Sequence, residues 1–149
     1  MSEGPIYLDY NATTPIDPAV AEAMLPYLRE HFGNPSSTHP YGVKTRTAVE
    51  TARAQVAALI GAQPEEVVFT SGGTESNNTV ILGVARSLRD RGRHIITSAV
   101  EHPATLEPCH ALEGEGFRIT QLPVDARGRV DPAAVAAAIT PETVLITIM

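Results

Sequence analysis

Several residue types that carry chemistry are scarce in this chain. Cys109 is the only cysteine among 149 residues, so neither an intrachain disulfide nor a metal site built from several cysteines can form. The eleven basic residues are ten arginines and one lysine, Lys44. Any chemistry that needs a lysine therefore uses Lys44 or lies outside this sequence.

Long apolar runs and an excess of positive charge are also missing. No stretch approaches the roughly 18 apolar residues that a membrane span requires. Seventeen acidic residues against eleven basic ones give a net charge of -6, the wrong sign for a protein that holds nucleic acid through its phosphates. Residues 1–5 show no basic stretch followed by an apolar one, as a targeting signal would. We therefore expect a soluble, cytoplasmic protein that binds neither membrane nor nucleic acid.

Glycine, proline and apolar spacing predict two helices in the first half of the chain. The first begins at Pro18 after an aspartate, carries a kink at Pro26 and ends at Gly33. The second spans residues 41–60, exposes Lys44 on its surface and ends at Gly61.

Strands and helices alternate from residue 67 onward. We expect strands at residues 67–70, 95–97, 117–124 and 144–149, and helices that begin after the glycine turn at 71–74, at Pro103 and at Pro132. This order predicts an α/β domain with a largely parallel sheet and helices on both faces. The last strand is apolar throughout, as an interior strand would be, so we expect the chain to be the N-terminal portion of a longer protein.

The turn Ser71-Gly72-Gly73-Thr74 is the best local candidate for a ligand site. Its glycines allow the backbone to come close to an anion, Thr74 can donate a hydroxyl, and the first N–H groups of the next helix point to the same place. The spacing matches neither the dinucleotide nor the P-loop pattern. The alternative is a tight turn in which Thr74 is an ordinary helix cap.

His102 lies at the next junction between a strand and a helix, so it falls on the same carboxyl edge of the sheet. A neutral imidazole there could stack on a planar ligand or move protons, and the alternative is a solvent-facing residue before a helix. A metal site through Glu101, His102 and His110 is unfavourable, because the two histidines are two helical turns apart. Cys109 falls within this helix and is expected to be buried.

Four segments together resemble a known family. They are Tyr7-Leu8-Asp9-Tyr10-Asn11-Ala12-Thr13-Thr14-Pro15, Phe32-Gly33-Asn34-Pro35-Ser36-Ser37, Val68-Phe69-Thr70-Ser71-Gly72-Gly73-Thr74-Glu75-Ser76-Asn77-Asn78 and Glu101-His102-Pro103. In order and spacing they resemble the N-terminal part of cysteine desulfurases and selenocysteine lyases, which are pyridoxal phosphate enzymes of the class V aminotransferase group. The resemblance implies the large domain of a fold type I enzyme. Residues 1–15 would lie near the substrate pocket, and residues 16–149 would form an incomplete cofactor-binding domain.

The resemblance also implies roles for single residues. Gly73 and Thr74 would bind the phosphate of pyridoxal phosphate, and His102 would stack on its ring and act in catalysis. Asn11, Ala12 and Thr13 are weaker, substrate-proximal candidates, and no metal is implied. The substrate would be L-cysteine or L-selenocysteine, and a cysteine thiolate of the enzyme would take the sulfur and leave alanine.

Most of the family's catalytic residues would follow Met149. The family's Schiff-base lysine, substrate arginine and persulfide cysteine match no position here, and Lys44 and Cys109 do not replace them. The implied parent enzyme is a homodimer that delivers sulfur to an acceptor or scaffold protein for iron-sulfur clusters or other sulfur carriers, and the chain alone is expected to be inactive. The alternatives are a selenocysteine lyase, a non-catalytic α/β phosphate-binding module, or one half of a split or interrupted enzyme.

Overall fold

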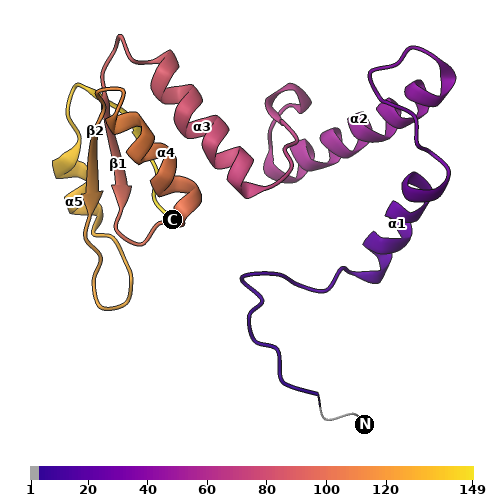
Figure 1. Ribbon diagram of the computed structural model, residues 1–149, viewed down its shortest axis with the longest axis horizontal. Coiled ribbons are helices and arrows are strands. Elements are labelled where there is room, and N and C mark those ends of the chain that lie inside the picture. Colours follow the sequence, from indigo (N-terminus) through magenta and orange to yellow (C-terminus); the bar gives the residue numbers. More distant parts are fainter. Residues whose placement is uncertain (1–3) are drawn as a thin grey trace. The chain divides into compact units, whose positions relative to one another are not determined.

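A computed structural model describes residues 4–149, and contacts within the chain divide it into two compact units that meet between Phe69 and Thr70. The described part of residues 1–15 belongs to the first unit. Within the described residues, no helix is both long enough and apolar enough to cross a bilayer. Figure 1 shows both units, which are described separately below.

The N-terminal unit is built on two helices that begin where the sequence predicts. Helix α1 (Pro18–Arg29) starts after Asp17, whose carboxylate accepts a hydrogen bond from the backbone N–H of Ala19 at 2.8 Å. Helix α2 (Pro40–Ile60) ends at Gly61, which adopts the left-handed conformation with φ of 70°. A short 3₁₀ helix, η1 (Pro64–Glu66), follows.

The predicted role of Gly33 as a helix end is wrong. Helix α1 ends at Arg29, and the backbone N–H of Glu30 closes it by donating to the carbonyl of Pro26. Gly33 instead packs against the chain at the start of α2, where a Cβ atom would collide with the backbone carbonyl of Tyr41. The hydroxyl of Thr45 donates to the Gly33 carbonyl at 2.7 Å, so this glycine serves close packing of a loop.

The predicted strand at residues 67–70 is absent, and the segment has an irregular extended backbone. Within the described residues it pairs with no neighbouring strand, and a strand needs a partner for its backbone hydrogen bonds. Arg53 of α2 contacts the segment in two ways. Its guanidinium donates to the carbonyl of Val67 and lies 4.9 Å from the centre of the Phe69 ring.

The C-terminal unit has the predicted alternation of helices and strands. Its elements are α3 (Gly73–Ser87), β1 (His94–Ser98), α4 (Pro103–Glu113), β2 (Arg118–Leu122), α5 (Pro132–Ala138) and β3 (Thr143–Ile146). The three strands form one sheet in the order β2-β1-β3, with both pairs parallel. The prediction of a parallel α/β sheet is confirmed, although α3 ends at Ser87 and not at Gly92.

One face of the sheet is covered by α3 and α4. The core on this side joins Ile81 and Ala85 of α3, Ile95 of β1, and Cys109 and Leu112 of α4, all nearly inaccessible to water. Full burial of a side chain such as Ile95 contributes about 1.5 to 3 kcal/mol to folding. Ile81, one of the apolar residues that predicted α3, belongs to this cluster.

The other face of β1 carries a polar residue. His94 is fully buried, and its two ring nitrogens lie 2.8 Å from the hydroxyls of Thr120 on β2 and Thr143 on β3. Burial lowers the pKa of His94, with a smaller lowering from Arg118 and an opposing contribution from Glu142. This histidine therefore links all three strands in its neutral form.

The strand order determines where the helices lie and where a ligand can bind. The chain passes from the central strand β1 through α4 to β2, then back across β1 through α5 to β3. Because such crossovers are right-handed, α4 and α5 cover opposite faces, as Figure 1 shows. The connections reverse direction at β1, and ligands of such sheets bind beyond the carboxyl ends of the strands at this reversal.

Candidate functional site

The N-terminus of α3 offers unpaired donors at the carboxyl edge of the sheet. Gly72 caps the helix without a side-chain hydrogen bond, and the first backbone bond runs from Ser76 N–H to the Gly72 carbonyl at 3.1 Å. Within residues 4–149, the N–H groups of Gly73, Thr74 and Glu75 and the hydroxyl of Thr74 donate to no protein group. The alternative reading of Thr74 as the helix cap is therefore wrong, and these donors can face an anion.

Gly73 keeps the approach to these donors open. A Cβ atom placed there would meet nothing within 4 Å, and the glycines with positive φ are Gly61, Gly116 and Gly128. The backbone at Gly73 therefore does not require a glycine. Its lack of a side chain matters for ligand approach and not for the backbone conformation.

Glu75 holds the turn before α3. One of its carboxylate oxygens, Oε2, accepts from the backbone N–H of Ser71 at 2.7 Å and from the Ser71 hydroxyl at 2.6 Å. These two hydrogen bonds lower the pKa of Glu75. A negative charge near the helix start also interacts favourably with the helix dipole. The Glu75 carboxylate thus fixes the conformation of the turn without a ligand.

His102 is the cap of α4 as well as a candidate ligand contact. Its Nδ1 accepts a hydrogen bond from the backbone N–H of Ala104 at 3.0 Å. The neutral ring therefore carries its proton on Nε2, and the side chain is exposed. The sequence predicted the location of His102 but not this capping role.

Thr74 and His102 line the same pocket, which has a volume of about 280 Å3. It lies between the first turns of α3 and α4 and is mostly apolar, with Asn78, Pro103, Ala104, Glu107 and Pro108 as its other lining residues. Deeper between the two helices, the Asn77 amide donates to the Thr105 hydroxyl at 3.3 Å. The structure thus brings together the glycine turn and the histidine that the sequence singled out separately.

Glu101 appears in the sequence analysis as an unfavourable metal ligand and as part of the segment Glu101-His102-Pro103, and the structure gives it a further role. Its side chain is 8% exposed, and Oε1 accepts from the Ser98 hydroxyl and from the backbone N–H of Met149, both at 2.6 Å. It thereby connects the loop that carries His102 to the chain beyond β3. The only sequence signal was its position directly before His102.

The remaining candidates lie elsewhere along the chain. Asn11, Ala12 and Thr13 form an exposed turn in the N-terminal unit, where the Ala12 N–H donates to the Asp9 carbonyl at 3.1 Å, and their closeness to a substrate stays a prediction. Lys44 is exposed and Cys109 is buried, both as predicted. Burial raises the pKa of the Cys109 thiol, with smaller contributions from nearby carboxylates. In residues 4–149 no cluster of three metal-ligating side chains occurs.

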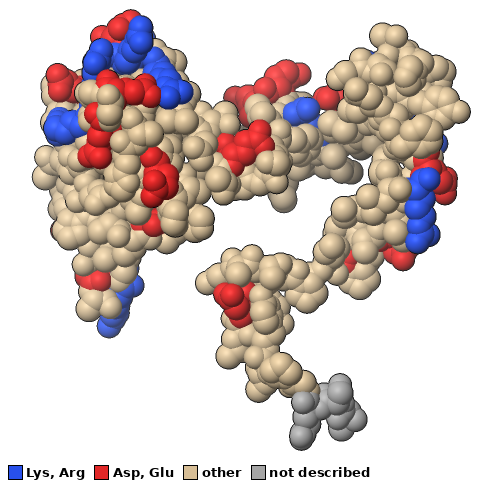
Figure 2. All heavy atoms as spheres, viewed as in Figure 1, with Lys and Arg blue, Asp and Glu red and all other residues tan. Residues whose placement is uncertain are grey.

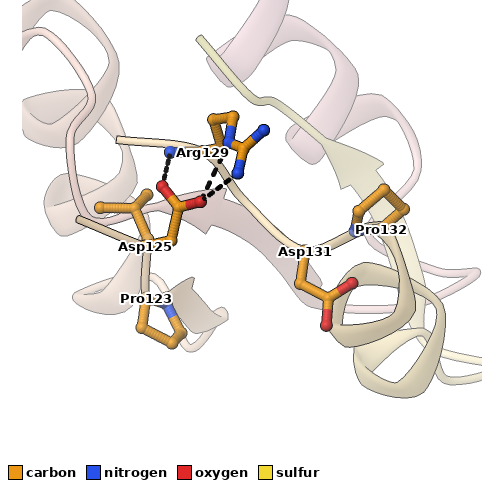
Figure 3. Close-up of a pocket in the computed structure, with 6 residues that line it drawn as sticks. Pro123, Asp125, Arg129, Asp131 and Pro132 are labelled. Carbon is orange, nitrogen blue, oxygen red and sulfur yellow. Dashed lines mark hydrogen bonds and ion pairs between the residues drawn. The ribbon is translucent and has the colours of Figure 1, made fainter. Parts of the chain in front are cut away.

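A larger pocket of about 430 Å3 lies beside the loop after β2. Figure 3 shows that Asp125 there is paired with Arg129. The carboxylate also accepts from the backbone N–H groups of Arg127 and Arg129, at 2.8 and 3.0 Å. These partners lower its pKa, and the remaining lining is largely proline and valine. Asp125 and Arg129 bind each other, and Asp131 accepts from the Ala133 N–H at the start of α5, so the charged groups of this pocket are already engaged within the protein.

Comparison with known proteins agrees with the motifs. The aminotransferase class V family matches residues 6–149. The chain is 59% identical over 144 residues to a cysteine desulfurase IscS of Dictyoglomus turgidum, covering 97% of this chain and 36% of that protein. It is 53% identical over 146 residues to a cysteine desulfurase of Homo sapiens, covering 97% of this chain and 32% of that protein. The chain thus spans about a third of the length of these curated relatives.

Solved structures share the fold at similar coverage. A NifS-like protein superposes with a TM-score of 0.89 at 40% identity, over 93% of this chain and 38% of that one. A structure described as SspA in complex with cysteine gives a TM-score of 0.89 at 42% identity, over 95% of this chain and 41% of that one. The resemblance drawn from four sequence motifs is confirmed. The chain belongs to the class V aminotransferase family, and its relatives in that family include cysteine desulfurases.

Proposed function

We propose that this chain is the N-terminal part of a pyridoxal phosphate-dependent cysteine desulfurase, which takes sulfur from L-cysteine and leaves alanine. The observation that carries the proposal is the convergence of the unpaired donors at Gly73 and Thr74 with the ring of His102 on one pocket. Relatives named cysteine desulfurase, and a similar structure described as a complex with cysteine, support the choice of substrate.

The residues present fit the phosphate group of the cofactor. Three backbone N–H groups and the Thr74 hydroxyl have no other partner within the described chain, and the open space over Gly73 admits an anion. When bound, pyridoxal phosphate supplies an electron sink for breaking the carbon–sulfur bond. Gly73 and Thr74 would hold the phosphate, and Glu75 would keep the turn in shape.

His102 would provide an apolar ring face and one mobile proton. Because Nδ1 is engaged with the Ala104 N–H, the proton available in the neutral form is on Nε2. The ring is also fixed in orientation by this hydrogen bond, which suits stacking on a planar group.

The partners and location of the parent enzyme are proposals as well. A homodimer is supported by the many exposed apolar side chains of the N-terminal unit, such as Leu8 at 83% and Phe32 at 79%. Delivery of sulfur to an acceptor or scaffold protein for iron-sulfur cluster assembly is supported by the IscS name of a relative. The cytoplasmic location rests on the sequence alone.

Thr74→Ala tests the phosphate site. Loss of a hydroxyl hydrogen bond to a charged group costs about 1.5 to 3 kcal/mol, which corresponds to about ten- to a hundredfold weaker cofactor binding. Because the hydroxyl has no partner in the protein, the free energy of unfolding should change by less than about 0.5 kcal/mol. Thr74→Ser is the matched control and should keep the affinity. Equilibrium dialysis measures the affinity for pyridoxal phosphate, and urea unfolding measures the free energy of unfolding. An unchanged affinity in Thr74→Ala would refute the phosphate site.

His102→Asn tests the ring without removing the helix cap, because asparagine is also a strong N-cap residue. We expect normal stability, with weaker binding of the cofactor and slower turnover of L-cysteine by the complete enzyme. His102→Ala, in contrast, should also lose about 1 kcal/mol of stability with the cap. Wild-type affinity and turnover in His102→Asn would rule out a role for the ring.

A further inference from the structure

Arginines gather at the amino edge of the sheet, opposite the candidate cofactor pocket. A pocket of about 390 Å3 is lined by Arg89, Arg91, Arg93 and Arg118, together with Asp90, Gly92, Gly116 and Glu142. Figure 2 shows this concentration of basic side chains at the upper end of the C-terminal unit. The chain as a whole carries a net charge of -6, so the patch stands out from an acidic background.

Three of these four arginines lack an acidic partner in the described chain, as do Arg29, Arg46 and Arg127, which lie scattered elsewhere. Arg53, Arg86 and Arg129 each form an ion pair at 3.1 Å or less. Within residues 4–149, neither Arg91 nor Arg93 has a carboxylate within 4 Å. The remaining two have weak partners: Arg89 lies 3.9 Å from Asp90, and Arg118 donates to the Thr140 hydroxyl at 3.4 Å. The pocket lining thus has four guanidinium groups against two carboxylates, those of Asp90 and Glu142, and keeps an excess of positive charge.

The fold holds these side chains next to one another. Arg93 directly precedes β1 and Arg118 begins β2, and the Arg118 N–H donates to the Arg93 carbonyl at 2.8 Å. Two glycines in the pocket lining leave room: a Cβ atom at Gly116 would lie 3.3 Å from an Arg93 guanidinium nitrogen, and one at Gly92 would collide with the Glu142 carbonyl. The close spacing of the arginines is thus set by the parallel pairing of β1 and β2.

We propose that this arginine patch, defined by Arg89, Arg91, Arg93 and Arg118, docks an acidic segment of a partner protein. Guanidinium groups bind carboxylates in a bidentate manner, and several of them at neighbouring strand ends match several acidic side chains on one segment. The acidic character of the chain and the two carboxylates in the pocket lining oppose a continuous polyanion such as nucleic acid.

The position of the patch leaves the cofactor pocket free. Strand β1 has five residues, so its two ends lie about 13 Å apart at 3.3 Å per residue. His102 follows the carboxyl end, and the patch lies at the amino end. A partner bound at the patch would therefore stay attached while substrate enters the opposite edge. The proposal does not depend on the function of that edge.

The test uses fluorescein-labelled hexaglutamate and fluorescence anisotropy at 50 mM NaCl. Arg91→Ala/Arg93→Ala should weaken binding at least tenfold, and the loss should resemble that caused by 300 mM NaCl in the wild type. Lys44→Ala/Arg46→Ala removes the same charge from the exposed surface of α2 and should leave binding within twofold. Arg91→Lys/Arg93→Lys keeps the charge and should bind with intermediate affinity.

Three results would overturn the proposal. Equal weakening by both alanine double variants would mean that only net charge matters. Displacement of hexaglutamate by equimolar inorganic phosphate would indicate a small-anion site. Tighter binding of a thymidine 20-mer than of hexaglutamate, lost in the Arg91/Arg93 variant, would assign the patch to nucleic acid. Urea unfolding of each variant checks that the fold is intact.

Discussion

Replacing Glu101 by alanine tests how the loop that carries His102 is held. The carboxylate accepts two short hydrogen bonds, from the buried Ser98 hydroxyl and from the backbone N–H of Met149. In the alanine variant both donors lose their acceptor. The buried Ser98 hydroxyl left unpaired costs about 1 to 3 kcal/mol, whereas the N–H of Met149, a residue that is 75% exposed, can bind water instead. Removal of a nearly buried charge offsets part of this cost. We expect a net loss of about 1 to 3 kcal/mol in the free energy of unfolding.

Glu101→Gln separates the hydrogen bonds from the charge. The amide oxygen can still accept from both donors, although neutral acceptors are weaker, so we expect a loss of about 1 kcal/mol. Glu101 also raises the pKa of the buried Cys109 thiol by its charge, and this contribution should vanish in both variants. Urea unfolding and the pH dependence of thiol alkylation in the protein measure the two effects. Glu107→Ala, an exposed acid on α4, is the stability control.

A double-mutant cycle measures the coupling between Ser98 and Glu101. If the Ser98 hydroxyl acts through Glu101, then Ser98→Ala should cost much less in the Glu101→Ala background than alone, with a coupling of about 1 kcal/mol. The account is refuted if Glu101→Ala is as stable as the wild type, or if Glu101→Gln is as unstable as Glu101→Ala.

Three further expectations follow from the fold. Burial lowers the pKa of His94 below its ordinary value of 6.5, so on acidification the unfolded chain binds this proton before the folded chain does. The free energy of unfolding should therefore fall as the pH drops below about 6.5 and level off below the pKa of the folded state. In His94→Gln, the urea midpoint should depend less on pH over this range. Gly92→Ala should destabilise the protein by more than about 1 kcal/mol, because the new Cβ atom would collide with the Glu142 carbonyl. Gly83→Ala in α3 places its Cβ atom in open space and should stabilise the protein by about 0.5 to 1 kcal/mol. Equal thermal midpoints for the two variants would contradict the close contact at Gly92. Lys44 lies exposed on α2, so incubation of this chain with pyridoxal phosphate and borohydride should give no stoichiometric adduct on it, and peptide mapping that finds one would make Lys44 functional.

The helix starts were predictable because their signals are local. Asp17 and Asp131, each directly before a proline, cap α1 and α5 through hydrogen bonds to a backbone N–H two residues ahead. Gly61 likewise ends α2 in the left-handed conformation that its position predicts. Such interactions involve residues two to four positions apart, so the sequence contains all their participants.

Predictions failed where the deciding partner is distant in sequence. Residues 67–70 have a strand-like composition but no strand beside them in the described chain, so composition alone was misleading. Gly33 was assigned to a helix end, and its actual reason is the approach of the Tyr41 carbonyl in a tight loop. The alternative role of Thr74 was the N-cap of the helix, and only the observed hydrogen bonds exclude it.

The sequence by itself determined the parallel α/β class and the family motifs, because strand and helix patterns and ordered motifs are local features of the chain. It also predicted Gly73, Thr74 and His102 as site residues. Tertiary structure alone decided that α3 and α4 place their first turns on one pocket, that Glu101 connects β1 to the chain beyond β3, and that arginines from two strand ends meet at the opposite edge. The physical reason is that parallel pairing brings together the ends of strands separated by a crossover helix. That pairing depends on packing between residues far apart in the sequence, so it cannot be predicted from a local sequence pattern.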